Sequence, residues 1–174
     1  MDLILKAAQF AAKAHAGQTR KYEKTPYVHH PARVAGRVAV RPDATEVMVA
    51  AAFLHDVLED AQQWGKELGA QFGDAVLSLV QEMTNPSMES TAPRAERKRM
   101  DREHLAKASR EAKVIKMLDR IDNLTDAAVV SNFAPMADWV KMYARESLLL
   151  VEVIGQADPE LEKELRDLAN QLIP

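Results

Sequence analysis

The sequence of 174 residues contains no cysteine. Disulfide bonds, thiol nucleophiles and thiolate metal ligands are therefore excluded. A metal ion bound by this chain would need nitrogen and oxygen ligands, which histidine and carboxylate side chains supply.

A long uninterrupted apolar run is also missing. The N-terminal segment MDLILKAAQFAAKAH is interrupted by Asp2, Lys6 and Lys13, so it fits neither a signal peptide nor a membrane span. Hydrophobic residues make up 47% of the chain and charged residues 28%, as in ordinary soluble globular proteins. We therefore expect a cytoplasmic protein without a membrane partner, and the length suits one domain over residues 1–174.

Acidic residues outnumber basic residues only slightly. A formal net charge of −3 argues against a general nucleic-acid-binding surface. Basic residues do cluster locally, in the segments RKYEK and ERKRM. We expect no nucleic-acid partner, and either a monomer or a homodimer.

Strand patterns are missing as well, because we find no short segment that alternates apolar and polar residues between turn signals. Helical periodicity recurs instead, which predicts an all-α protein. A capping box of Asp43 and Glu46 is expected to open the most apolar helix, and Ser109 and Asp158 are expected to cap later ones. The predicted helices cover residues 2–16, 31–40, 44–60, 64–72, 74–83, 94–108, 112–128, 135–154 and 159–173.

The segment AAFLHDVLED ends an apolar helix with four ionisable residues. On a continuous helix His55 lies beside Glu59, and Asp56 lies beside both Glu59 and Asp60. Neighbouring carboxylates at the end of a buried helix lose solvation and repel one another. A divalent cation would remove that cost, whereas the simpler alternative is a solvated helix end whose histidine caps carbonyl groups.

Two other segments carry polar residues in unusual positions. TPYVHHP places His30 at the entrance of a helix that begins at Pro31. KMLDRIDNL places Lys116, Asp119 and Asn123 on one helical face, opposite the apolar stripe. Asp119 taken alone would ordinarily be a surface acid, so its role depends on finding a partner.

Taken in order, the segments RKYEKTPYVHHP, FLHDVLED, ERKRM and KMLDRIDNL resemble the HD-domain hydrolases of the alarmone (p)ppGpp. These are the hydrolase domains of Rel/Spo-type proteins and the stand-alone small alarmone hydrolases. The resemblance extends from about Ala7 to about Tyr143. It implies an HD-domain helical bundle of roughly eight to ten helices around one core.

The resemblance also implies roles for particular residues. Glu59 and Asp60 match an acidic pair that orients and deprotonates the attacking water. The implied metal ligands are His30, His55, Asp56 and Asp119, a nitrogen and oxygen set that suits Mn²⁺, with other divalent ions such as Zn²⁺ or Fe²⁺ also possible. The implied substrate contacts are Arg20, Lys21, Arg97, Lys98, Arg99, Asn123 and Tyr143.

Some positions depart from the family pattern or fall outside it. Lys24, preceded by Glu23, stands where the family commonly has a glycine, which affects the expected shape of the loop near the base. His29 is not a family ligand. His15 and His104 match no motif, so we expect them to be structural or surface residues.

The implied reaction is metal-dependent removal of the 3′-pyrophosphate of ppGpp or pppGpp, giving GDP or GTP and pyrophosphate. One alternative is a phosphohydrolase that uses the same centre on another nucleotide, either (p)ppApp or the 2′-phosphate of NADPH. Another is a nucleotide-binding sensor without catalysis, although binding alone would not require both Glu59 and Asp60. The basic residues taken singly could also be solvated, and Tyr143 could be a core residue.

Overall fold

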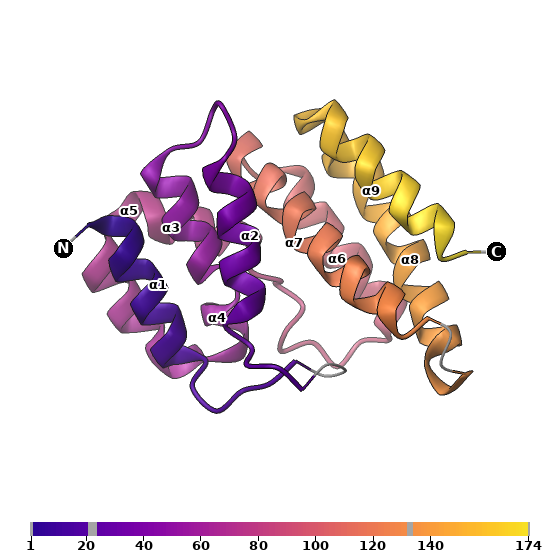
Figure 1. Cartoon of the computed structure of the whole chain (residues 1–174), viewed down its shortest axis with the longest axis horizontal. Helices are drawn as coiled ribbons and strands as arrows, with labels where there is room; N and C mark the ends of the chain where they lie inside the picture. The colour runs from indigo at the N-terminus through magenta and orange to yellow at the C-terminus, as the bar shows by residue number, and fades with distance from the viewer. Residues whose placement is uncertain (1, 21–23, 132–133, 174) are drawn as a thin grey trace. The chain divides into compact units, whose positions relative to one another are not determined.

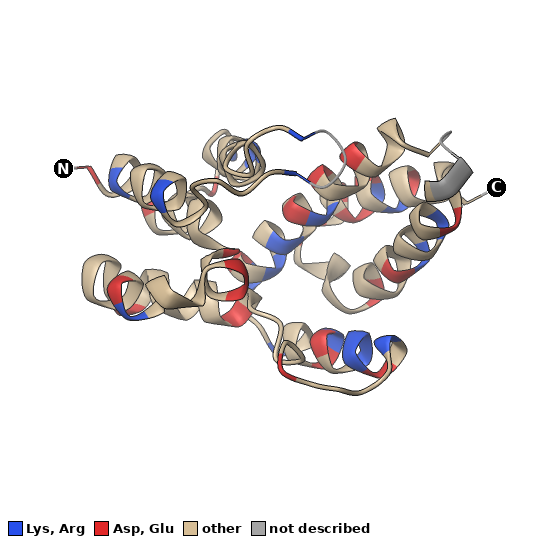
Figure 2. Cartoon of the chain, turned by 90° about the horizontal axis from the view of Figure 1, so that it is seen from below, with Lys and Arg blue, Asp and Glu red and all other residues tan. Residues whose placement is uncertain are grey.

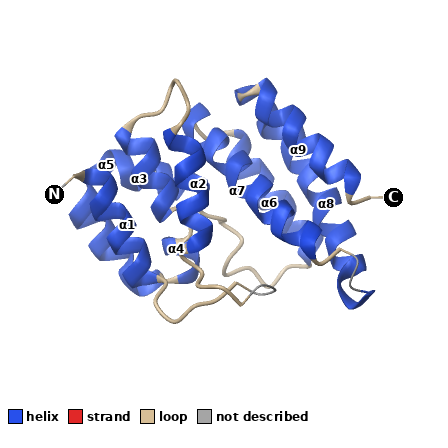
Figure 3. Ribbon diagram, in the orientation of Figure 1, coloured by secondary structure: helices blue, strands red, loops and turns tan. Residues whose placement is uncertain are grey.

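The computed structural model describes residues 2–20, 24–131 and 134–173. Every regular element among them is helical, which confirms the predicted all-α class (Figure 3). The described residues form one isolated backbone bridge, between Thr19 and Pro26. None of the described helices is both long and apolar enough to cross a membrane.

The chain divides into two compact units, Met1–Met88 and Glu89–Pro174. The expectation of one domain over residues 1–174 stays a prediction.

The first unit is built around helix α3, which packs against α1, α2 and α5 (Figure 1). This central place follows from its sequence, EVMVAAAFL, which is apolar nearly all round. Three consecutive alanines in it have no exposed surface, so they allow the neighbouring helices to approach closely. The helices of this unit are α1 (Leu3–Ala14), α2 (His29–Ala39), α3 (Glu46–Leu54), α4 (Val57–Asp60), the short 3-10 helix η1 (Gln62–Trp64) and α5 (Gly65–Met83).

The predicted start of α3 was wrong by two residues. Thr45 is the N-cap, and its side chain accepts a hydrogen bond from the backbone N–H of Met48 at 3.2 Å. Asp43 lies too early in the chain for this role and accepts instead from Arg41 Nε at 3.1 Å.

The predicted continuous helix over 44–60 is also wrong. It ends at Leu54, turns at His55 and Asp56, and resumes as the four residues of α4. Helix α2 begins at His29 rather than at Pro31, so His30 lies in its first turn. The break expected between the two short helices over 64–83 is present as a kink at Gly73, whose φ of 74° favours glycine.

In the second unit α7 packs against α8 and α9, and α6 packs against α8. The predicted caps are confirmed, because Ser109 accepts from the N–H of Ala112, and Asp158 accepts from the N–H groups of the first turn of α9. Basic and acidic residues are interspersed along the helices (Figure 2). The elements are α6 (Arg94–Ala106), α7 (Arg110–Val129), α8 (Ala134–Ile154), the 3-10 helix η2 (Gly155–Ala157) and α9 (Pro159–Gln171).

Candidate active site

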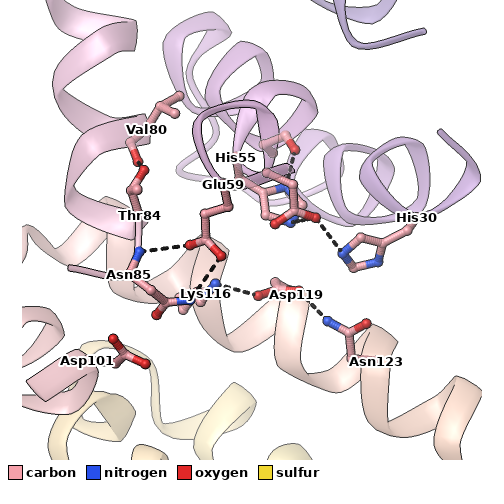
Figure 4. A network of polar contacts seen from close by, with 12 residues as sticks. His30, His55, Glu59, Val80, Thr84, Asn85, Asp101, Lys116, Asp119 and Asn123 are labelled. Atoms are coloured by element: carbon pink, nitrogen blue, oxygen red, sulfur yellow. Dashed lines mark hydrogen bonds and ion pairs between the residues drawn. The ribbon is translucent and has the colours of Figure 1, made fainter. Parts of the chain in front are cut away.

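Three of the predicted ligands lie together in the first unit. His30 comes from the first turn of α2, whereas His55 and Asp56 form the turn after α3, and all three are buried. Asp56 Oδ2 lies 3.5 Å from His30 Nε2 and 3.1 Å from His55 Nε2 (Figure 4). One possible ligand atom from each residue lies within 4.8 Å of the other two, a spacing that allows one metal ion to bind all three.

Hydrogen bonds from outside this cluster orient its members. The Nδ1 atom of His55 lies 2.8 Å from the carbonyl oxygen of Ala52, so Nδ1 carries the proton and Nε2 presents a lone pair. Tyr27 donates its hydroxyl to Asp56 Oδ2 at 2.7 Å. A lone pair facing a carboxylate oxygen in a buried site is repulsive, and a divalent cation would make this arrangement favourable. The buried residues therefore fit a metal ion.

The surroundings of Asp60 and Tyr27 are strongly anionic. Burial raises the pKa of the Asp60 carboxyl, and the negative charge of Asp56 raises it further. Burial also raises the pKa of Tyr27 far above its usual range, with further contributions from the charges of Asp56 and Asp60. Tyr27 therefore keeps its proton and acts as a donor to the carboxylates.

The carboxylate of Glu59 is held by a residue that the sequence analysis did not identify. Asn85 donates its backbone N–H to Glu59 Oε1 at 2.8 Å and its side-chain amide to Oε2 at 3.0 Å (Figure 4). Asn85 lies in the loop after α5, 26 residues along the chain from Glu59. Nothing in the local pattern of that loop could have predicted the contact.

The loop after α1 brings Arg20 toward the same cluster. Its guanidinium carbon lies 5.6 Å from the ring centroid of Tyr27, the residue that donates to Asp56. Arg20 N donates to Thr25 O at 2.8 Å, and Lys24 N donates to Arg20 O at 3.2 Å. Lys24 has a φ of 58°, in the left-handed region where a glycine is easiest to place. Lys21 and Glu23 lie outside the described residues.

In the second unit Asp119 has the partners that the sequence could only suggest. Its Oδ2 lies 2.9 Å from Lys116 Nζ, and its Oδ1 accepts from Asn123 Nδ2 at 2.6 Å (Figure 4). Asp119 is 4% exposed, so it is not an ordinary surface acid. Lys116 and Asp119 are buried and Asn123 is half-buried, so the predicted polar face of α7 is a connected and largely buried set.

The three basic residues predicted on α6 differ in their surroundings. Lys98 Nζ lies 3.0 Å from Asp101 Oδ2, and Arg99 pairs with both Glu96 and Glu103 on its own helix. The hydrogen bond with Glu96 and the charge of Glu103 raise the pKa of Arg99. Arg97 differs, because its Nε is buried and has no hydrogen-bond partner among the described residues.

The predicted contact Tyr143 belongs to a stack of planar groups in the second unit. The ring of Trp139 lies parallel to that of Tyr143, with centroids 5.1 Å apart and an interplanar angle of 12°. The guanidinium carbon of Arg120 lies 4.5 Å from the Tyr143 centroid. Arg120 follows Asp119 directly in the sequence, and no motif marks it, because one more arginine on a helix is no signal by itself.

Comparison with known proteins shows which family the chain belongs to. The sequence profile described as "HD domain" matches residues 7–146, which include residues of both units. Among curated proteins, the guanosine-3′,5′-bis(diphosphate) 3′-pyrophosphohydrolase MESH1 of Xenopus tropicalis is 42% identical over 126 residues, covering 71% of this chain and 69% of that protein. The Homo sapiens protein of the same name is 34% identical over 170 residues, covering 97% and 93%.

A solved structure agrees with these sequence relatives. It is described as "A metazoan ortholog of SpoT hydrolyzes ppGpp and plays a role in starvation responses", with a TM-score of 0.81, 32% identity, and coverage of 98% of this chain and 96% of that one. The chain therefore belongs to the HD-domain family, in the group that contains the guanosine-3′,5′-bis(diphosphate) 3′-pyrophosphohydrolases.

Proposed function

We propose that this chain is a metal-dependent hydrolase that removes the 3′-pyrophosphate of ppGpp and pppGpp. The products are GDP or GTP and pyrophosphate. Relatives named for this reaction match nearly the whole chain, which supports the substrate class. The observation that carries the proposal is the buried cluster of His30, His55 and Asp56, with the acidic residues of α4 beside it in the chain.

We assign the metal to His30, His55 and Asp56, and we propose Asp119 as the fourth ligand on the family resemblance alone. Imidazole and carboxylate ligands suit Mn²⁺, with Zn²⁺ or Fe²⁺ as other candidates. When bound, a divalent ion polarises a phosphoryl oxygen and lowers the pKa of water.

The chain's own acids then hold and deprotonate the attacking water. Glu59 is the better placed of the two, because Asn85 fixes both oxygens of its carboxylate. Asp60 has a raised pKa, which brings it closer to the range where a base works efficiently at neutral pH. Water attacks the phosphorus attached to the ribose 3′ oxygen, the bond between them breaks, and that oxygen leaves as a hydroxyl after taking up a proton.

Cationic and polar residues are proposed to bind the nucleotide. Arg97 is the strongest phosphate contact of the α6 segment, because its buried Nε needs an acceptor. Lys21, Lys98 and Arg99 stay predicted phosphate contacts from the family pattern. Arg20, Asn123 and Tyr143 are proposed to lie near the base and ribose.

A substrate panel tests this proposal. The purified chain with Mn²⁺ should release pyrophosphate from ppGpp, and Asp56→Ala should lose activity and bound metal together. An active Asp56→Ala protein with unchanged metal content would contradict the ligand assignment. Faster turnover of ppApp or NADPH would favour another nucleotide, and tight binding of ppGpp without turnover at saturating Mn²⁺ would favour a sensor.

Location and assembly are also proposed from sequence alone. We propose a cytoplasmic protein that is a monomer or a homodimer, with a small nucleotide as its partner and neither nucleic acid nor a membrane. The small net charge of −3 supports the absence of a nucleic-acid partner.

A further inference from the structure

Gln18 connects several parts of the first unit at one point. Its side-chain Oε1 lies 2.8 Å from His15 Nδ1, and its Nε2 donates to the backbone carbonyl of Asp60 at 3.1 Å. Its backbone N–H donates to His15 O, and its carbonyl accepts from Tyr27 N, both at 3.0 Å. One residue therefore joins the end of α1, the end of α4 and the tyrosine that donates to Asp56.

His15 is arranged to fix the side chain of Gln18. Because the amide nitrogen of Gln18 donates to Asp60, its oxygen must face His15, and His15 Nδ1 then carries a proton. His15 is 2% exposed, and its Nε2 has no hydrogen-bond partner among the described residues. Its ring also packs against Tyr27, with centroids 4.8 Å apart. Burying a histidine with one unsatisfied nitrogen lowers the stability of the fold, so the presence of His15 at this position calls for an explanation. Its hydrogen bond to Gln18 offers one.

Helix α4 needs support from outside because it has only four residues. Its N–H groups at Glu59 and Asp60 both bond to Asp56 O, and the carbonyl of Asp60 lies at its C-terminal end, where the helix supplies no donor. The Gln18 amide satisfies that carbonyl. The same short helix carries both Glu59 and Asp60, so its placement sets the placement of the two acids.

We propose that Gln18 and His15 are positioning residues for the Glu59 and Asp60 pair. His15 sets the orientation of the Gln18 amide, and that amide holds the end of α4. The catalytic part of this proposal rests on the proposed function, whereas the structural part does not.

The direct test is Gln18→Glu, which keeps the size of the side chain and replaces the donor to Asp60 O with an acceptor. With ppGpp and saturating Mn²⁺, we expect kcat to fall about 10–100-fold, as for other residues that orient active-site groups. KM and the affinity for Mn²⁺ should not change, because among the described residues Gln18 forms no hydrogen bond with His30, His55 or Asp56. The matched control is Gln9→Glu, the same change at an exposed position of α1, which should leave all three values unchanged.

Amide hydrogen exchange provides a readout that needs no activity. Exchange in the peptide covering residues 56–61 should be faster in Gln18→Glu than in wild type, and unchanged in Gln9→Glu. If wild type releases no pyrophosphate, the proposed function is wrong. Amide hydrogen exchange then still tests whether Gln18 holds α4 in place. Unchanged exchange, or an unchanged kcat in an active enzyme, would overturn the inference.

Two substitutions separate the hydrogen bond of His15 from its packing. His15→Asn keeps an N–H donor near the position of Nδ1, whereas His15→Phe keeps a ring against Tyr27 and removes the donor. We expect His15→Asn to retain most of the wild-type kcat and His15→Phe to lose as much as Gln18→Glu. The opposite order, or equal losses in proteins with equal melting temperatures, would refute the role of His15.

Discussion

Tyr27 illustrates how one hydroxyl group organises the candidate metal cluster at the scale of single residues. Its proton is kept by burial and by the neighbouring negative charges, and it is donated to the Asp56 oxygen that faces both histidines. Hydrogen bonds of this kind fix the direction of a ligand and change its affinity for metal.

Tyr27→Phe should therefore lower the affinity for Mn²⁺ about 10-fold, because Asp56 loses its donor and can rotate away from the histidines. Titration calorimetry measures the affinity. Tyr143→Phe makes the same chemical change in the second unit and should leave Mn²⁺ binding at the wild-type value. Equal affinities in all three proteins would show that the Tyr27 hydroxyl does not orient Asp56.

The backbone of Lys24 gives a second prediction at this scale. Its φ of 58° costs a non-glycine residue about 1 kcal/mol. Lys24→Gly should raise the free energy of unfolding by up to about 1 kcal/mol, less the added entropy of the unfolded chain. Lys24→Ala keeps the strained conformation and should give no such gain in urea denaturation. A gain in both variants would mean that loss of the lysine charge, rather than relief of strain, is responsible.

At the scale of elements, α4 is held by two segments of the chain. Gln18 precedes α4 in the sequence, and the loop after α5 follows it. Asn85 in this loop holds both oxygens of Glu59. Asn85→Ala should lower kcat about 10–100-fold with unchanged metal content, because only the acid is released. Asn170→Ala, at an exposed position of α9, is the matched control and should retain full activity. A fully active Asn85→Ala enzyme would argue against Glu59 as the base.

Helix α6 allows neighbouring arginines to be compared. Arg99 is already paired with two acids of its own helix, whereas Arg97 has a buried and unpaired Nε among the described residues. Arg97→Gln should therefore raise KM for ppGpp by about 10-fold, in line with the loss of one charge-assisted hydrogen bond. Arg99→Gln should change KM far less. A larger effect at Arg99 would reverse our choice of phosphate contact.

Elements whose signals are local could be predicted from sequence. Ser109 and Asp158 cap helices where a polar residue precedes an apolar period, and the structure agrees with both. The turn at His55 and Asp56 could not be predicted, because the apolar pattern runs through it without a proline or glycine. Asn85 was missed for a related reason, since its contact with Glu59 depends on how α5 places a distant loop.

At the scale of the whole molecule, the proposed ligands come from both units. His30, His55 and Asp56 belong to the first, and Asp119 belongs to the second, where it is bonded to Lys116 and Asn123. All four ligands were implied by the family resemblance; the structure groups the first three, whereas the fourth still rests on the resemblance.

Asp119→Asn tests that fourth ligand. The amide keeps the shape of the side chain and removes its charge, so Mn²⁺ affinity should fall about 10–100-fold if Asp119 binds the ion. Asp122→Asn, a nearby buried carboxylate on the same helix, should leave the affinity unchanged. Identical affinities in wild type and Asp119→Asn would limit the protein ligands to those of the first unit.

Metal removal should be visible in the stability of the folded chain. A ligand that binds only the native state at 100 times its dissociation constant adds about 2.7 kcal/mol to the free energy of unfolding. Chelation with EDTA should therefore lower the melting temperature, and Mn²⁺ should restore it. The double variant His30→Ala and His55→Ala should melt at one temperature with or without EDTA.

The link between His55 and the carbonyl of Ala52 bears on how long a bound ion would stay. Ala52 is completely enclosed in α3, the helix at the centre of its unit, so the imidazole is anchored to the part of the fold expected to open least often. Escape of the ion through a brief local fluctuation should consequently be infrequent. Exchange of metal with the solution is then expected to be slow, with a rate that follows the unfolding of α3 rather than the motion of the surrounding loops.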